Sequence, residues 1–194
     1  MRLRMKNKII LHLCADIGSD TLPYKEAGYD VRCIGKDIGV ENYHPPENVY
    51  GIIANPPCTM FSCARTTAKT ARDMKLGMFC VRECLRIIWE CQYQTTKDVP
   101  HKLSFWVIEN PATGYLKHYL GEPIYRYEQW EFGGEIRKRT ALWGLFKHPE
   151  KMIKNMPEGV KGKTSDASWG RRKQGQGRSI CFYGFAKAFF EANL

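Results

Sequence analysis

Residues 49–58 read Val-Tyr-Gly-Ile-Ile-Ala-Asn-Pro-Pro-Cys, an apolar run that ends abruptly in polar and proline residues. A short apolar run without alternation is typical of a strand buried on both faces of a parallel sheet. The two prolines restrict the backbone of the segment that carries Cys58. We therefore predict a buried strand over residues 49–54 whose carboxyl end presents Cys58 at the edge of a sheet.

Three other segments follow the same pattern of an apolar run that stops at polar or turn residues. They are residues 8–14, followed by Asp16 and Gly18; residues 30–34, followed by Gly35-Lys36-Asp37; and residues 103–108, followed by Glu109-Asn110-Pro111. Helical patterns separate them over residues 21–27, ended by Gly28, and over residues 72–94. This alternation predicts an α/β fold with a mostly parallel central sheet, whose ligands bind where the strands end.

The composition indicates one globular domain over residues 1–194. The chain is 43% hydrophobic and 26% charged, which excludes a disordered or fibrous protein. No apolar run approaches the roughly 20 residues that a membrane helix needs. A secretory signal pattern is also missing from the N-terminal residues, so we predict a cytoplasmic protein without membrane contact.

The eight cysteines suit a reducing compartment, where they remain thiols. Their spacing fits no zinc pattern, and Cys80, Cys84 and Cys91 recur at helical intervals that favour core packing. We predict no metal site.

The net charge of +10 favours a polyanionic partner, and it is concentrated near the C-terminus. Residues 147–178 hold nine basic and three acidic residues, so they carry six of the ten net charges. The segment is rich in glycine and has little periodicity, which predicts a long loop or hairpin. Phosphate binding and a solvated basic linker are both compatible with this composition.

Two strand ends place reactive groups at the predicted edge. Cys58 is a candidate nucleophile, although a free cysteine is also commonly a structural core residue. Glu109 ends the neighbouring run, so a nucleophile and an acid can face one pocket. Arg137 and Arg139 alternate along a predicted strand and share one face, where they can bind a carboxylate or phosphate. An ordinary exposed strand has the same pattern.

The chain resembles the DNA cytosine-5 methyltransferases in five motifs, which occur along the chain in the same order as in that family. Residues 12–19 with 25–29 are similar to the first S-adenosylmethionine motif, and Pro56-Pro57-Cys58-Thr59-Met60-Phe61-Ser62 is similar to the Pro-Cys nucleophile loop. Glu109-Asn110-Pro111 is similar to the Glu-Asn motif, and Glu135-Ile136-Arg137-Lys138-Arg139 is similar to the Gln-x-Arg-x-Arg motif. Residues 177–180 with 184–188 are similar to the closing motif and the final helix of the family. Departures from the family are Cys14, Asp16, Thr59, Glu135 and Arg178.

The resemblance implies a Rossmann-like S-adenosylmethionine-dependent methyltransferase fold. It implies that Cys58 attacks C6 of a flipped-out cytosine, that Glu109 binds the base edge, that Arg139 holds the base oxygen or orients Glu109, and that Arg137 meets a phosphate. The cofactor S-adenosyl-L-methionine would be held by Cys14, Ala15, Asp16, Ile17, Gly18, Asp37, Pro57, Arg178, Ser179 and Ile180. Asp37 is expected at the ribose, with Glu41 or Asn42 as a weaker choice for the adenine.

The partner implied by the resemblance is double-stranded DNA, and the protein would associate with the nucleoid. Residues 145–176 are expected to form a reduced, basic target-recognition segment, and residues 177–194 to return to the cofactor site. Expected nucleic-acid contacts are Ser62, Arg65, Lys69, Arg72, Lys161, Lys163, Arg171, Arg172 and Lys173. An RNA (tRNA) cytosine-5 methyltransferase and an inactive nucleic-acid-binding protein of the same fold are the alternatives. The oligomeric state is open.

Overall fold

The protein forms a six-stranded sheet of order β2-β1-β3-β4-β6-β5. Its structure, a computed structural model, describes residues 8–15, 17–65, 68–93, 103–160 and 180–194. The strands are β1 (Ile9–Leu13), β2 (Asp30–Ile34), β3 (Val49–Ala54), β4 (Phe105–Pro111), β5 (Tyr125–Glu128) and β6 (Arg139–Leu145). The helices are η1 (Ser19–Thr21), α2 (Leu22–Glu26), η2 (Val40–Asn42), α3 (Met74–Gln92), α4 (Lys117–Leu120), η3 (Gln129–Phe132) and α7 (Tyr183–Ala192).

The sheet is mostly parallel, as the sequence predicted. β1 pairs in parallel with β2 and β3, and β3 pairs in parallel with β4. β6 is antiparallel to β4 and to β5. Because β6 runs in the opposite direction, its first residues lie at the edge where the parallel strands end.

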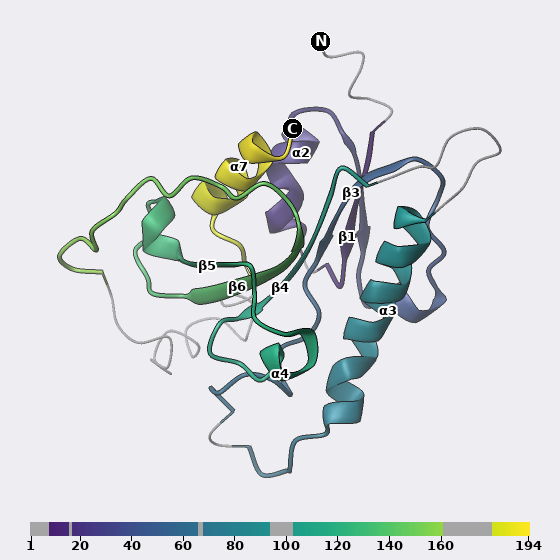
Figure 1. The fold of residues 1–194 in the computed structure, drawn as a ribbon, viewed down its shortest axis with the longest axis horizontal. Helices are drawn as coiled ribbons and strands as arrows, with labels where there is room; N and C mark the ends of the chain where they lie inside the picture. The colour runs from purple at the N-terminus through teal and green to yellow at the C-terminus, as the bar shows by residue number, and fades with distance from the viewer. Residues whose placement is uncertain (1–7, 16, 66–67, 94–102, 161–179) are drawn as a thin grey trace.

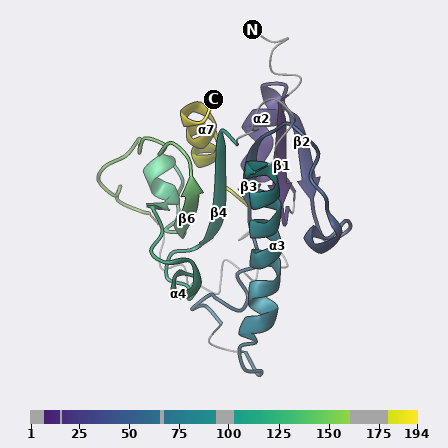
Figure 2. The same cartoon turned by 45° about the vertical axis from the view of Figure 1, so that its right-hand side comes forward.

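Helices cover both faces of the sheet (Figure 1). α3 lies over one face, in front of β1 and β3 in Figure 2, while α2 and α7 lie together on the other face. Strand residues alternate between these two cores: Leu11 and Ile52 pack on the α3 side, and Ile10 and Ile53 on the α7 side. This alternation follows from the two-residue repeat of a strand, and it explains why the apolar runs are continuous.

The two predicted helices form with slightly different ends. α3 begins at Met74, and the carboxylate of the preceding Asp73 accepts a hydrogen bond of 2.9 Å from Leu76 N and so caps the first turn. Its buried positions include Val81, Cys84 and Ile88, spaced as an amphipathic helix requires. α2 is preceded by η1 and is followed by Gly28 with a φ of 91°, a conformation that glycine adopts readily.

Two strand boundaries differ from the prediction. β4 runs on to Pro111, because residues 106–111 pair with residues 140–145 of β6. Arg137 lies before β6, which begins at Arg139, so the expectation that both arginines alternate along one strand was wrong. The partner strand, rather than local sequence, sets these ends.

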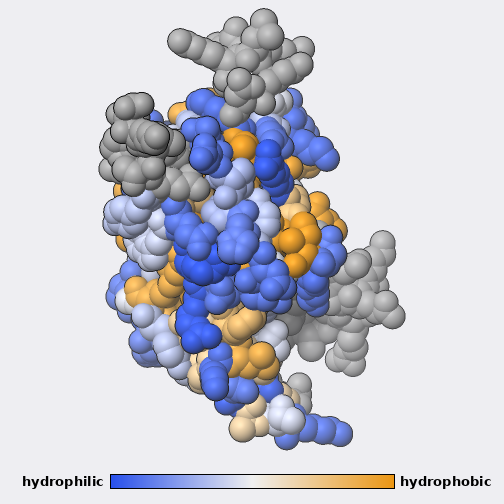
Figure 3. All heavy atoms as spheres, turned by 90° about the vertical axis from the view of Figure 1, so that its right-hand side faces the viewer, coloured by the Kyte–Doolittle hydropathy of each residue, from blue (hydrophilic) through white to orange (hydrophobic). Residues whose placement is uncertain are grey.

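Residues 146–160 contain neither helix nor strand, in agreement with the first part of the loop predicted over residues 147–178, while residues 161–178 lie outside the described residues. The chain here packs against η3: Met152 N and Ile153 N donate to Glu131 O, and Lys151 pairs with the Glu131 carboxylate at 2.7 Å. In Figure 3 hydrophilic residues cover most of the face that carries α3, with apolar areas between them. Among the helices of the described ranges, none combines the length and apolar character needed to cross a membrane.

Candidate functional site

Polar groups from four strands gather at the carboxyl edge of the parallel strands. The chain passes from β1 to β2 on one side and then to β3 on the other, which makes the β1–β3 junction the switch point of the sheet. Ligands of open α/β sheets bind in the crevice at such a point. Cys14, Asn55 and Glu109 come from three of these strand ends, and Arg139 from the start of β6.

Cys58 lies in a tight turn directly after β3 and is half-buried. Its carbonyl accepts hydrogen bonds from Phe61 N at 2.9 Å and from Ser62 N at 2.7 Å. The guanidinium group of Arg72 holds the far side of this turn, since it donates to Met60 O at 2.7 Å and to Ser62 O at 2.9 Å. The backbone that carries Cys58 is thus fixed on both sides.

The basic residues near this turn contribute less to a cationic surface than the sequence suggested. Arg72 is occupied within the chain, and it also lies 4.8 Å from the ring centre of Tyr115. Arg65 donates to Thr70 at 2.8 Å, and the hydroxyl of Ser62 accepts from the backbone of Ala64. Arg72 thus stabilises the turn, and its expected contact with nucleic acid stays a prediction. Lys69 is exposed.

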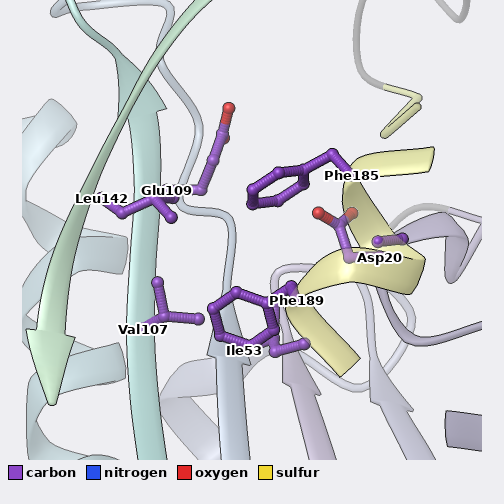
Figure 4. A pocket seen from close by; sticks show the side chains of 8 residues that line it. Asp20, Ile53, Val107, Glu109, Leu142, Phe185 and Phe189 are labelled. Atoms are coloured by element: carbon purple, nitrogen blue, oxygen red, sulfur yellow. The ribbon is translucent and has the colours of Figure 1, made fainter. Parts of the chain in front are cut away.

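Glu109 lines a small pocket between β3, β4 and α7 (Figure 4). The carboxylate of Asp20 lies across the pocket from it, with the ring of Phe185 between the two. Val107 and Leu142 add apolar walls. Its walls are mainly apolar, and the carboxylate of Asp20 beside the ring of Phe185 favours a cationic group over a neutral one.

Asp20 belongs to a buried polar network that the sequence did not reveal. His12 Nε2 lies 2.9 Å from the side-chain oxygen of Asn55, and His12 Nδ1 lies 3.3 Å from the hydroxyl of Thr21. The amide nitrogen of Asn55 donates to Asp20 at 3.5 Å, and His12 Nε2 is 3.8 Å from the same carboxylate. This network ties the end of β1 to the end of β3.

Arg137 and Arg139 share one carboxylate, that of Glu128 at the end of β5. Arg137 donates through Nε and Nη2 at 3.0 and 3.2 Å, and Arg139 through Nε at 2.9 Å. Trp130 adds an indole hydrogen bond of 2.5 Å. The two guanidinium groups therefore lie side by side, as the sequence predicted, although Arg137 lies in the irregular chain before β6 rather than in a strand.

The pKa of Glu128 is shifted by this arrangement. Burial opposes ionisation, but hydrogen bonds from Arg137, Trp130 and Arg139 outweigh it and lower the pKa to about 2. The carboxylate is therefore ionised at neutral pH, and it keeps both arginines oriented.

The loop after β1 is held between β1 and β2. Cys14 has a φ of 54°, and Ala15 N donates to Ile34 O at 3.1 Å. An added Cβ at Gly35 would lie 2.9 Å from the Asp37 carboxylate and 3.0 Å from Ala15 O, so Asp37 lies close to this loop. The exposed side chain of Ile17 and the left-handed Gly18 complete it.

The C-terminal segment returns to the same loop. Cys181 N donates a hydrogen bond of 3.0 Å to the hydroxyl of Ser19, and α7 contacts both η1 and α2. Ile180 is exposed beside it, as is Pro57 next to Cys58.

Part of the expected site lies outside the described residues. This part comprises Asp16, Arg178 and Ser179 of the expected cofactor site and Lys161, Lys163, Arg171, Arg172 and Lys173 of the expected nucleic-acid surface. In the described ranges no three His, Cys, Asp or Glu side chains come together to hold a metal ion.

Five residues that organise the site were not predicted as site residues from the sequence. Asn55 and Asn110 directly follow or end buried strands, a signal that also marked Glu109 and could have found them. His12 is a polar residue inside an apolar run, which is unusual enough to notice. Asp20 and Glu128 carry no comparable signal, because their partners are distant in sequence.

Comparison with known proteins identifies no family for this chain. No protein-family model matches this chain, and no curated protein matches it. The chemistry of the site therefore has to be argued from its own residues.

Proposed function

We propose that this protein is a DNA cytosine-5 methyltransferase of Rossmann-like fold that uses S-adenosyl-L-methionine. One observation carries the proposal: the Cys58 turn is bonded directly to the strand end that bears Glu109. Asn110, which follows Glu109, donates from its buried side chain to Pro56 O at 3.0 Å. This hydrogen bond would fix the nucleophile and the base-binding carboxyl group relative to each other, as methyl transfer to a ring carbon requires.

The sheet supports the proposed fold. Its cofactor site would lie at the switch point between β1 and β3, and a carboxylate at the end of β2 would face the ribose. Asp37 lies there, close to the loop after β1.

The site also fits the charge of the proposed cofactor. S-adenosylmethionine carries a sulfonium cation, and the pocket offers the carboxylate of Asp20 and the ring of Phe185. Ile17, which is 66% exposed, provides apolar surface beside the loop. Cys14, Ala15, Ile17, Gly18 and Asp37 are the described residues that would hold the cofactor, with Pro57 and Ile180 at its margins.

In the proposed reaction Cys58 acts first. Its thiolate would add to C6 of cytosine, which would make C5 nucleophilic enough to take the methyl group as the bond from that carbon to the cofactor sulfur breaks. The cofactor, when bound, supplies this methyl group as an electrophile. Loss of the C5 proton to a base and departure of Cys58 from C6 restore the aromatic ring.

Glu109 and the arginine pair stabilise this addition. Glu109, in its protonated form, would donate a hydrogen bond to the ring nitrogen, where negative charge develops, and would accept one from the exocyclic amine. Glu128 already orients both guanidinium groups, and its bond to Arg139 uses only Nε. The terminal nitrogens of Arg139 can therefore bind the base oxygen, while Arg137 meets a phosphate.

The substrate base has to leave the duplex to reach Cys58, at a cost of about a few kcal/mol. The net charge of +10 favours the duplex as partner. Arg65 and Lys69 follow the Cys58 turn, and with Arg137 they are proposed to approach the phosphates beside a flipped base.

The test is transfer of radiolabelled methyl from S-adenosylmethionine to unmethylated duplex DNA, followed by nucleoside analysis. The wild type should produce 5-methylcytosine, and Cys58→Ser should produce none. Cys63→Ser is the matched control, because Cys63 lies in the same segment and donates to Thr113 O. It should retain activity.

A parallel reaction with tRNA separates the alternatives. Label in tRNA alone would replace the DNA assignment with an RNA cytosine-5 methyltransferase. No label in either substrate, from folded wild-type protein, would overturn the enzymatic proposal in favour of a binding protein.

A further inference from the structure

Cys14, at the end of β1, lies against two cysteines of α3. Its sulfur is 3.7 Å from the sulfur of Cys84, 70 residues away, and it also contacts the thiol of Cys80. The helical spacing of Cys80 and Cys84 predicted core packing, but it gave no sign of a third thiol. The structure thus gathers three cysteines where the candidate cofactor loop begins.

The backbone at Cys14 directs its thiol toward α3. Leu13 and Cys14 both pack with the core on the α3 side, which strict strand alternation does not allow. The φ of 54° at Cys14 accounts for this reversal. A left-handed conformation at a residue other than glycine costs about 1 kcal/mol or more, and such strain is concentrated at functional positions.

The three thiols differ in reactivity. A hydrogen bond from Cys84 lowers the pKa of Cys14 against the effect of burial, and Cys80 adds to this effect. Burial raises the pKa of Cys80 to about 11, while the hydrogen bond with Cys14 and then burial raise that of Cys84. Cys14 and Cys80 are both half-buried and Cys84 is fully buried, so reagents can reach Cys14 and Cys80, and of these two Cys14 ionises first.

We propose that Cys14 and Cys84 form a reversible dithiol–disulfide pair that reacts with low-molecular-weight disulfides. The thiolate of Cys14 attacks one sulfur of the reagent, forms a mixed disulfide and releases one reagent thiolate. The thiol of Cys84 loses its proton and attacks the sulfur of Cys14, which forms the internal disulfide and releases the second thiolate. Two protein thiols are oxidised, and one reagent disulfide is reduced to two thiols.

Formation of this bond has a mechanical consequence. The sulfur atoms must approach from 3.7 Å to about 2.05 Å, so the start of the loop must move toward α3. This loop continues through Ala15 to Gly18. If it holds the cofactor, a point that rests on the proposed function, oxidation should weaken cofactor binding.

The first experiment maps disulfides in the reduced protein after exposure to oxidised glutathione, with acid quench, alkylation and peptide mass spectrometry. The wild type should give a peptide pair joined through Cys14 and Cys84, lighter by the two thiol hydrogens. Cys84→Ala should instead accumulate a stable glutathione adduct on Cys14. Cys91→Ala, also buried on α3, is the control and should keep the bridge.

A second variant tests the same pairing in case Cys84→Ala does not fold. Cys14→Ser alters a half-buried position, and it should leave Cys84 unmodified. A stable adduct on Cys14 of the wild type, a bridge to Cys80, or modification of exposed Cys33 and Cys63 without Cys14 would each overturn the pairing.

Calorimetry with S-adenosylmethionine then separates the two proposals. Oxidised protein should bind the cofactor at least about tenfold more weakly than reduced protein, with recovery in dithiothreitol. If reduced protein does not bind it at all, the proposed function fails while the mapped disulfide still decides the redox pair. Equal affinity in both states would overturn the coupling of this pair to the loop.

Discussion

The side-chain nitrogen of Asn110 donates a hydrogen bond of 3.0 Å to the backbone carbonyl of Pro56. Asn110 is fully buried, and its side-chain oxygen has no partner within the described residues. Pairing of β4 with β6 fixes its backbone, since Asn110 lies opposite Ala141. The position of the Cys58 turn is therefore set by the sheet rather than by the turn alone.

Replacement of Asn110 by aspartate should loosen this turn. An ionised carboxylate cannot donate to Pro56 O, so a buried acceptor is left unpaired at a cost of about 1–3 kcal/mol in the free energy of unfolding. Urea denaturation measures this loss, and the methyl-transfer assay should show a lower kcat. Asn155→Ala, at an exposed position, is the control and should change neither. An unchanged unfolding midpoint in Asn110→Asp would contradict the assignment.

Glu128→Gln should destabilise the protein at neutral pH by about 1–2 kcal/mol, because two arginines lose an ionised acceptor. The folded pKa of Glu128, about 2, lies below its ordinary value of 4.5. Its contribution to stability is therefore complete above pH 4.5 and is lost as the pH falls toward 2. Urea unfolding of both proteins at neutral pH and near pH 3 should show the difference shrinking.

The exposed ion pair of Glu122 and Arg126 supplies the comparison. Glu122→Gln should change stability by less than about 0.5 kcal/mol, since both side chains are solvated. Equal losses in the two variants would argue against a special role for Glu128.

Asp20→Asn should weaken binding of S-adenosylmethionine by about tenfold, because the pocket loses the negative charge of the Asp20 carboxylate. The substitution preserves shape, so the fold should persist by circular dichroism. Glu191→Gln, at the exposed end of α7, is the matched control. Unchanged affinity in Asp20→Asn, measured by calorimetry, would remove the sulfonium argument for this pocket.

Gly51→Ala should destabilise the core on the α7 side. An added Cβ would lie 2.3 Å from the ring of Phe105, closer than two carbon atoms can approach. Overpacking of this kind costs about 1–3 kcal/mol. The double variant with Phe105→Leu should recover part of the loss relative to the sum of the single variants, as thermal unfolding can measure. Strict additivity would count against direct contact.

The sequence was sufficient for the parallel strands and for α3, because their patterns are local. Continuous apolar runs predicted β1, β2 and β3, and helical spacing predicted α3. The ends of β4 and β6 depend instead on the pairing of the two strands, because Pro111 becomes part of β4 only by pairing with Thr140 of β6. A segment such as Glu109-Asn110-Pro111 reads as a strand terminus until its partner is known.

The candidate site divides in the same way. Cys58 and Glu109 could be predicted to share an edge, because parallel strands end together. The bonds that orient the site join His12 to Asn55 and Glu128 to Arg137, and no periodicity links these pairs. Such contacts depend on side-chain rotamers and on loop paths, which a single sequence does not specify.

The hydrogen bond from Cys181 N to the hydroxyl of Ser19 spans 162 residues. Closing so large a loop costs conformational entropy before any contact repays it, so chains rich in such contacts fold slowly. The packing of α7 against η1 also forms one wall of the pocket between Asp20 and Glu109. A refolding chain should therefore form its sheet before it recovers ligand binding. The delay between these two events would measure how long α7 takes to dock.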